Sequence, residues 1–314
     1  MPDLKTLLQL GRVPNVFTAM SNVLGAYLLS HYDLADASAV ALLLISTSCL
    51  YIAGMVLNDV FDVDIDTQER PERPIPSGRI SQAAASRIGW GLLAAGVATA
   101  VVLTALRGTP TPAIVAVLLA VAIVGYDAVL KRSAFLGPPT MGLCRALNVL
   151  LGLSLVADGW FQWHPMFWCA AGGIGVYVTG LTLFARHEAD ENAGRGGPLL
   201  GMFVMLAGIA VLAYFPQLAD HELPTAAEPQ LITGTIMWQL MWGIFGFFVV
   251  RRCLPALAAP SPATMQFAVK QSIFAMVLFD AAIVTATRGP MPYALVVVAL
   301  AVPMVLLGRF VYST

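Results

Sequence analysis

Three oxygen-bearing side chains recur at every fourth position near residue 60 of this chain. Asn58, Asp62 and Asp66 follow a long apolar run, and on a continuing helix this spacing places one amide and two carboxylates on one face, with Asp59 and Asp64 pointing elsewhere. Such groups suit a hard cation such as Mg²⁺, which often completes its coordination shell with substrate phosphate. The spacing therefore predicts a metal site at the end of this helix.

Basic residues follow these acids directly. Arg70, Arg73 and Arg79 carry guanidinium groups, which form bidentate hydrogen bonds to phosphate oxygens, so the order of acid then base predicts a metal and a diphosphate bound together. Three prolines and Gly78 in the same stretch are expected to end the helix and shape a turn. The alternative is a solvated loop whose charges only orient a membrane protein. The spacing and the position after an apolar run favour the metal-diphosphate site.

The rest of the chain describes the membrane protein that must hold this site. Its 314 residues are 58% hydrophobic and 11% charged, with a mean hydropathy of +0.79, which the polar surface of a soluble domain does not allow. Because about 20 apolar residues cross a bilayer, and no segment alternates with the period of a β-barrel, we predict an all-α, polytopic transmembrane helical bundle that forms a single domain over residues 1–314. The predicted spans, about ten in number, are 10–31, 38–60, 83–106, 111–128, 136–156, 165–185, 197–216, 230–250, 265–287 and 291–311.

Positive charges are strongly biased to one side of these spans. Of the 17 Lys and Arg residues, fourteen fall on the side of the N-terminus, Arg107 and Arg288 fall on the other, and Arg145 lies inside a span. The positive-inside rule then places both termini and the acidic loop in the cytoplasm. The net charge of −1, without a basic run, gives no support to a nucleic-acid partner.

Arg145 is a charged residue inside predicted span 136–156, where Asn148 and Gly152 add to a polar face. An unpaired charge at this depth costs about 2.5 to 3.5 kcal/mol on insertion scales, so Arg145 must have a partner. It either forms a structural ion pair, with Asp280 or Asp127, or contacts substrate in a cavity. The sequence leaves both interpretations open.

The stretch NDVFDVDIDTQERPERPIPSG resembles the UbiA superfamily of intramembrane prenyltransferases, whose first motif is N-x-x-x-D-x-x-x-D followed by R-P-x-x-x-G. The resemblance extends to the opening GRVPNVFTAMSNVLGA and to YDAVLK, where Tyr126 and Lys131 resemble a loop of the family. It implies that Lys131 contacts a diphosphate. It also implies Mg²⁺-dependent transfer of a prenyl group from a polyprenyl diphosphate to a lipophilic acceptor within the membrane, on a plan of nine spans to which this chain adds a tenth.

The second acidic motif of the family, often D-x-E-x-D, corresponds here to ARHEADENAGR. Glu188 and Asp190 match it, whereas Arg186 occupies the place of the first acid. One interpretation is that a single Mg²⁺ together with Arg186 replaces two metals; another is that transfer has been lost, and a third is an ordinary hydrophilic loop. The motif is similar to that of a bacterial branch called EboC-like, which implies a bacterial inner membrane.

These observations predict an enzyme in which the metal and the arginines neutralise the departing diphosphate while the prenyl tail lies between helices. No Ser/His/Asp or Cys/His arrangement suggests a covalent nucleophile. The expected catalytic residues are Asp62, Asp66 and Asp190, the metal ligands are these three with Asn58, and the substrate contacts are Asn58, Arg70, Arg73, Tyr126, Lys131, Arg145, Arg186 and Glu188.

Two other classes of function remain. A membrane carrier or binder of an isoprenoid diphosphate would keep the site but not turn it over, and Arg186 motivates this alternative. A secondary transporter is less favoured, because the two halves of the chain lack matching interrupted spans.

Overall fold

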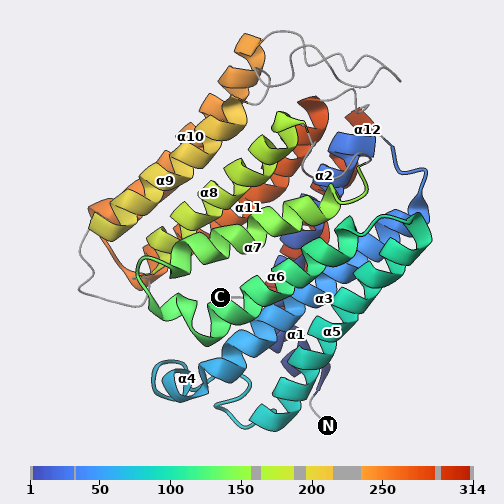
Figure 1. Cartoon of the computed structure of the whole chain (residues 1–314). Coiled ribbons are helices and arrows are strands. Elements are labelled where there is room, and N and C mark those ends of the chain that lie inside the picture. Colours follow the sequence, from blue (N-terminus) through green and yellow to red (C-terminus); the bar gives the residue numbers. More distant parts are fainter. Residues whose placement is uncertain are drawn as a thin grey trace.

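The computed structural model describes residues 3–31, 33–156, 164–186, 196–214, 235–286 and 291–311. In these ranges the chain is a bundle of long helices that lie side by side, and no strand occurs (Figure 1). The elements are α1 (Leu4–Leu10), the 3-10 helix η1 (Val13–Asn15), α2 (Val16–His31), α3 (Ala37–Phe61), α4 (Val63–Glu69), α5 (Gln82–Arg107), α6 (Thr111–Ala128), the 3-10 helix η2 (Leu130–Arg132), α7 (Gly137–Gly152), α8 (Pro165–Ala185), α9 (Gly196–Ala213), α10 (Thr235–Ala258), α11 (Pro262–Ala286), α12 (Met291–Ala299) and α13 (Ala301–Phe310).

Each of the ten predicted spans contains a long helix, or the pair α12 and α13, within the described residues, which confirms the polytopic all-α fold. Among the described residues, eight helices are long and apolar enough to cross a membrane, with α12 and α13 together forming the last of them. The other two spans, α2 and α7, are helices of 16 residues. At about 1.5 Å per residue they are shorter than the roughly 30 Å bilayer core. Most residues of both helices are either buried or half-buried, so protein covers much of their length.

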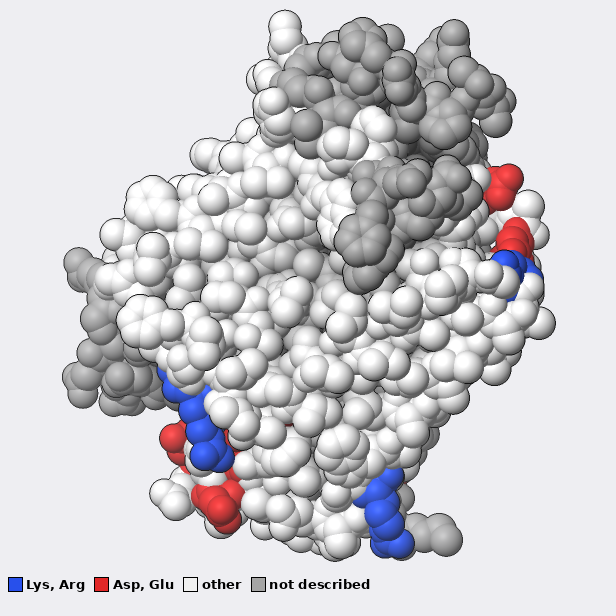
Figure 2. All heavy atoms as spheres, in the orientation of Figure 1, with Lys and Arg blue, Asp and Glu red and all other residues white. Residues whose placement is uncertain are grey.

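The outer surface matches a lipid environment. Figure 2 shows the Lys, Arg, Asp and Glu side chains of the visible face gathered near its ends, with a broad uncharged area between them. Large apolar side chains such as Val121, Phe203 and Phe247 are exposed on α6, α9 and α10. A soluble monomer rarely exposes so much apolar surface. The chain is therefore an integral membrane protein.

Helices α3 and α5 form a long antiparallel pair that carries the acidic motif at one end (Figure 1). At the other end, Arg107 donates a 2.8 Å hydrogen bond from Nε to Oδ2 of Asp36, the residue that caps α3. The Arg107 guanidinium lowers the pKa of the Asp36 carboxyl to about 2. This contact fixes the start of α3 against the end of α5, and so sets the register of the pair far from the motif.

Helices α8 and α9 approach so closely that their backbones touch at glycines. A Cβ atom on Gly180 would lie 2.3 Å from the Met205 nitrogen and 2.6 Å from the Gly201 oxygen, and one on Gly201 would lie 2.4 Å from the Phe184 nitrogen. Small residues at such a seam let transmembrane helices pack by van der Waals contact. The seam holds α8, which forms part of the cavity wall described below.

We expect Gly180→Ala to destabilise the protein by about 1 to 3 kcal/mol, because the added methyl meets backbone atoms that have no rotamer to change. Gly172→Ala in the same helix is the matched control, since a Cβ there meets no atom within 4 Å. The thermal unfolding midpoints of the two variants in one detergent check this. Equal midpoints would contradict the close packing of α8 on α9.

Candidate active site

The acidic motif lies at the junction of α3 and α4, where the helix is interrupted at Asp62. This residue ends α3 and starts α4 with φ −100° and ψ 9°. The hydrogen bonds from the Asp62 nitrogen to the Asn58 oxygen (3.0 Å) and from the Asp66 nitrogen to the Asp62 oxygen (2.8 Å) keep the four-residue spacing. The helix expected to continue through this stretch is interrupted at Asp62 alone, and its four-residue hydrogen-bond spacing is kept across the interruption.

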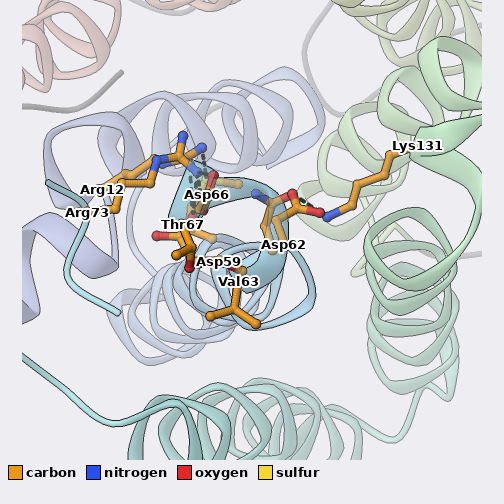
Figure 3. A network of polar contacts seen from close by, with 10 residues as sticks. Arg12, Asp59, Asp62, Val63, Asp66, Thr67, Arg73 and Lys131 are labelled. Atoms are coloured by element: carbon orange, nitrogen blue, oxygen red, sulfur yellow. Dashed lines mark hydrogen bonds and ion pairs between the residues drawn. The ribbon is translucent and has the colours of Figure 1, made fainter. Parts of the chain in front are cut away.

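Lys131 joins two of the predicted metal ligands. Its Nζ lies 3.0 Å from Oδ1 of Asn58 and 2.7 Å from Oδ2 of Asp62, and it comes from η2, just after α6 (Figure 3). The ammonium group thus lies where an amide oxygen and a carboxylate oxygen converge. The two oxygens thus bind a cation that comes from a residue 73 positions after Asn58.

A second ion-pair cluster lies beside the first. Nη1 of Arg73 donates to Oδ1 and Oδ2 of Asp66 at 2.8 and 2.7 Å and to Oδ1 of Asp59 at 3.3 Å, while Arg12 contacts the same Asp59 oxygen at 3.1 Å (Figure 3). Asp59 and Asp66 are each only 4% exposed. Such buried carboxylates depend on their cations. This cluster joins the turn after α4, the end of α3 and the residue that precedes η1.

Asp59 is a residue that sequence reasoning missed, since the four-residue spacing set it aside. The sequence feature that could have identified it is its spacing of seven residues from Asp66. Seven residues make two helical turns, which places both carboxylates on one face of a helix. The turn itself agrees with the sequence: α4 ends at Glu69, and Gly78 adopts φ +73°, a conformation that suits glycine.

A cavity of about 340 Å³ opens next to these clusters, between α3, α6, α7, α8 and α11. Much of its wall is apolar, with residues such as Leu119, Val178 and Ile273. The predicted substrate contacts that line it are Arg70, Arg73, Tyr126 and Arg145. The cavity therefore joins a charged end to an apolar interior, as an amphiphilic ligand requires.

Arg145 has neutral partners in the described part of the chain. It donates to Oδ1 of Asn22 at 3.2 Å and to Oγ1 of Thr18 at 3.1 Å, and its guanidinium lies 5.3 Å from the centre of the Tyr51 ring. Asp280, one of the two expected ion-pair partners, instead accepts from Nδ2 of Asn22 at 2.9 and 2.8 Å. Asn22 thus links the two charges, and Arg145 forms no direct ion pair with either Asp280 or Asp127.

Arg186 contacts the loop that follows Lys131. Its Nη1 and Nη2 donate to the backbone oxygens of Ser133 and Arg132 at 2.9 and 3.1 Å. The direct phosphate contact suggested by its place in the second motif stays a prediction; Arg186 is not among the described residues that line the cavity. It holds the loop that carries Lys131. Glu188 and Asp190, the other predicted residues of this motif, lie outside the described residues.

We expect Arg186→Ala to remove a residue that positions the Lys131 loop. The KM for a diphosphate donor should rise and turnover should fall by about 10- to 100-fold, the range seen when a group that orients a ligand-holding residue is removed. Arg186→Lys restores little, because the two carbonyls are bound by a planar fork. Steady-state kinetics at varied donor concentration check this. If Arg186→Asp bound an additional Mg²⁺ and gained activity, the positioning role would be wrong and the motif-based role correct.

The donor set fits Mg²⁺. Asn58, Asp62 and Asp66 offer oxygen ligands within three helical turns, and Asn58 with Asp62 already converges on a cation in the form of the Lys131 ammonium. The described residues nevertheless bring together no group of three acidic, His or Cys side chains that could hold a metal. Each carboxylate instead pairs with a cation of the chain. Metal binding therefore requires Lys131 or Arg73 to exchange a carboxylate for another anion, and a phosphate oxygen is suitable.

Comparisons with known proteins identify the family of this chain. The sequence profile of the UbiA prenyltransferase family matches residues 19–214. The digeranylgeranylglyceryl phosphate synthases of Metallosphaera sedula and Ignicoccus hospitalis are 33% identical over 164 residues and 34% identical over 158 residues. These matches cover 51% and 50% of this chain and 56% and 49% of the relatives. The chain thus spans about half the length of these relatives.

Solved structures share the fold along nearly the whole chain. A UbiA homologue from Archaeoglobus fulgidus bound to GPP and Mg²⁺ superposes with a TM-score of 0.65 at 16% identity, covering 94% of this chain and 99% of that one. A digeranylgeranylglyceryl phosphate synthase structure gives 0.64 at 20% identity, covering 91% and 99%. At these identities the likeness is one of fold.

Proposed function

Because this chain belongs to the UbiA prenyltransferase family, we propose that it transfers a prenyl group from a polyprenyl diphosphate to a lipophilic acceptor within the membrane, with Mg²⁺ as cofactor. The relatives named as synthases, and the homologue solved with GPP and Mg²⁺, support this reaction class. The donor and the acceptor are membrane lipids or lipid-like molecules, and nucleic acid has no part. The length of the donor chain stays open.

The observation that carries the proposal is the set of cation-binding oxygens and anion-binding cations at the α3–α4 junction, next to a largely apolar cavity that Arg70 and Arg73 line. Asn58, Asp62 and Asp66 would hold Mg²⁺, which supplies charge neutralisation of the diphosphate when bound. Lys131 and Arg73, released from these carboxylates, can then pair with phosphate oxygens. The cavity holds the prenyl tail out of water while the allylic C–O bond breaks.

The single domain over residues 1–314 is part of this proposal. The family match ends at residue 214, but α11 packs into the same bundle: the Tyr177 hydroxyl donates to the Ser272 oxygen at 3.0 Å, and Asp280 accepts from Ser21 at 2.6 Å. Residues of α11 also line the cavity. These contacts of α11 support a single domain over residues 1–314.

The proposed orientation places both termini and the α3–α4 junction in the cytoplasm of a bacterial inner membrane. The bias of positive charge supports the cytoplasmic side, and the resemblance of the second motif to a bacterial branch supports the membrane. Labelling of single cysteines introduced in the 70–79 turn and at Gly108, in sealed vesicles of known orientation, tests it. Equal access to both positions from one side would contradict this topology.

The function is tested with purified protein in lipid nanodiscs, Mg²⁺, ¹⁴C-labelled geranyl diphosphate and a total lipid extract of the source cells. We expect diphosphate release that depends on Mg²⁺ and a new lipid heavier by one geranyl group in mass spectrometry. A carrier is the second candidate, favoured by Arg186 in place of an acid in the second motif. It would bind the donor without releasing diphosphate, so the same experiment separates the two functions.

A further inference from the structure

Asp127 is a buried carboxylate that the cation clusters do not use. It lies in α6 near the end that leads to Lys131, is 3% exposed, and forms part of the cavity wall. Its Oδ2 is fully buried and has no hydrogen-bond partner among the described residues. None of the ion pairs formed by those residues includes Asp127. Sequence reasoning considered it only as a partner for Arg145.

In the described part of the chain, the charged groups around Asp127 form ion pairs with one another and none with Asp127. Lys131, Asp62, Arg12 and Asp59 are close enough to act on its carboxylate electrostatically. Lys131, however, pairs with Asp62 at 2.7 Å, and Arg12 pairs with Asp59 at 3.1 Å. A buried acceptor left without a donor costs about 1 to 3 kcal/mol, and more when charged. Such a group in a native protein calls for a ligand, a proton or a catalytic role.

The geometry points to a role of Asp127 in binding the prenyl acceptor. We propose that Asp127 accepts a hydrogen bond from a hydroxyl group of the prenyl acceptor and takes its proton during transfer; this rests on the function proposed above. Asp127 lines the cavity, but its Oδ2 is closed to solvent there, so a ligand hydroxyl reaches this oxygen only when the side chain turns toward the cavity. The acceptor is then an amphiphilic alcohol or phenol, with its apolar part in the same cavity.

The reaction balances without a further reactant. The allylic C–O bond of the donor breaks, and its electron pair leaves with the diphosphate. A lone pair of the acceptor oxygen forms the new C–O bond. The O–H bond of the acceptor breaks, its electrons stay on oxygen, and the proton passes to Asp127, which later releases it to water. The product is a prenyl ether, and proton removal by a positioned carboxylate contributes about 10²- to 10⁴-fold to the rate.

The test compares the parent with Asp127→Asn and Asp127→Glu in the geranyl-transfer assay with total lipid extract, and adds a binding measurement with geranyl S-thiolodiphosphate and Mg²⁺. We expect Asp127→Asn to lose about 10²- to 10⁴-fold in prenyl-lipid formation, with unchanged affinity for the thiolodiphosphate and a larger share of geraniol from capture by water. Asp127→Glu keeps part of the transfer. Acetylation of the hydroxyl groups in the extract should abolish transfer by the parent.

Each other outcome overturns the inference in a different way. Transfer by Asp127→Asn at the parent rate would exclude a proton acceptor, and weaker thiolodiphosphate binding or a higher Mg²⁺ requirement would place Asp127 with the donor. Transfer to the acetylated extract would exclude a hydroxyl acceptor. A parent that makes no prenylated lipid would instead contradict the proposed function itself. An Asp127→Asn protein that unfolds would show a structural role, which thermal unfolding of the same sample detects.

Discussion

Asp62→Asn and Asp66→Asn should each lower Mg²⁺-dependent prenyl transfer by about 10³-fold or more, the loss expected when a group that holds charge-stabilising contacts in the transition state is removed. The two variants should fail for different reasons. Asp62→Asn leaves Lys131 with Asn58 as its remaining described partner, and Asp66→Asn leaves Arg73 with Asp59. Either change removes a ligand oxygen charge from the proposed metal site.

The matched control is Asp64→Asn, which removes an acid from the same short helix. Asp64 is exposed and lies outside the ion-pair clusters, so its variant should keep parent activity and the parent Mg²⁺ requirement. Initial rates measured over a Mg²⁺ titration, with membrane insertion checked for each variant, decide the matter. Retention of transfer by Asp62→Asn and Asp66→Asn at the parent Mg²⁺ requirement would remove the α3–α4 junction from the reaction.

The parts of this site that lie close in sequence were predictable. The spacing of Asn58, Asp62 and Asp66 and the proline-rich turn each express a local preference, so the chemistry of a cation beside an anion site follows from residue types. The apolar runs likewise located the spans, because lipid imposes one requirement on every helix. Only the interruption at Asp62 departs from this local picture.

The choice of partner among charged residues was not predictable, because it depends on contacts between distant segments. Lys131 could have paired with Asp127 but pairs with Asp62, and Arg12 meets Asp59 across 47 residues. The contacts of Arg186 with the backbone oxygens of Ser133 and Arg132 likewise join distant segments, while its predicted phosphate contact stays a prediction. Composition determines the number of charged residues, whereas the fold determines which of them pair. Among the described residues, it leaves Oδ2 of Asp127 without a hydrogen-bond partner.

The second large effect concerns the charges linked by Asn22 inside the bundle. Asp280 is 3% exposed and accepts from Ser21 and Asn22, while Arg145 donates to the other end of the same Asn22 amide. Removing one charge leaves the other uncompensated at membrane depth. We expect Asp280→Asn and Arg145→Gln each to lower the unfolding free energy by about 2 kcal/mol.

The double variant should be more stable than either single variant, since it removes both charges together. This coupling, about 0.5 to 3 kcal/mol for groups in one network, is measured from unfolding midpoints in a fixed detergent. Asp280→Asn combined with Arg107→Gln is the control, because Arg107 lies in a different contact, with Asp36, and its effect should add. Additive behaviour of both pairs would show that Asn22 does not couple Asp280 to Arg145.

The same double variant separates the two roles that remained open for Arg145. If Arg145 serves only to balance Asp280, activity recovers along with stability when both charges are gone. Arg145 also lines the cavity, however, and its described partners are neutral side chains and the face of Tyr51, so its charge remains available to a ligand. We therefore expect prenyl transfer to stay low in the double variant although its fold is restored. Full recovery of activity would assign Arg145 to the fold alone.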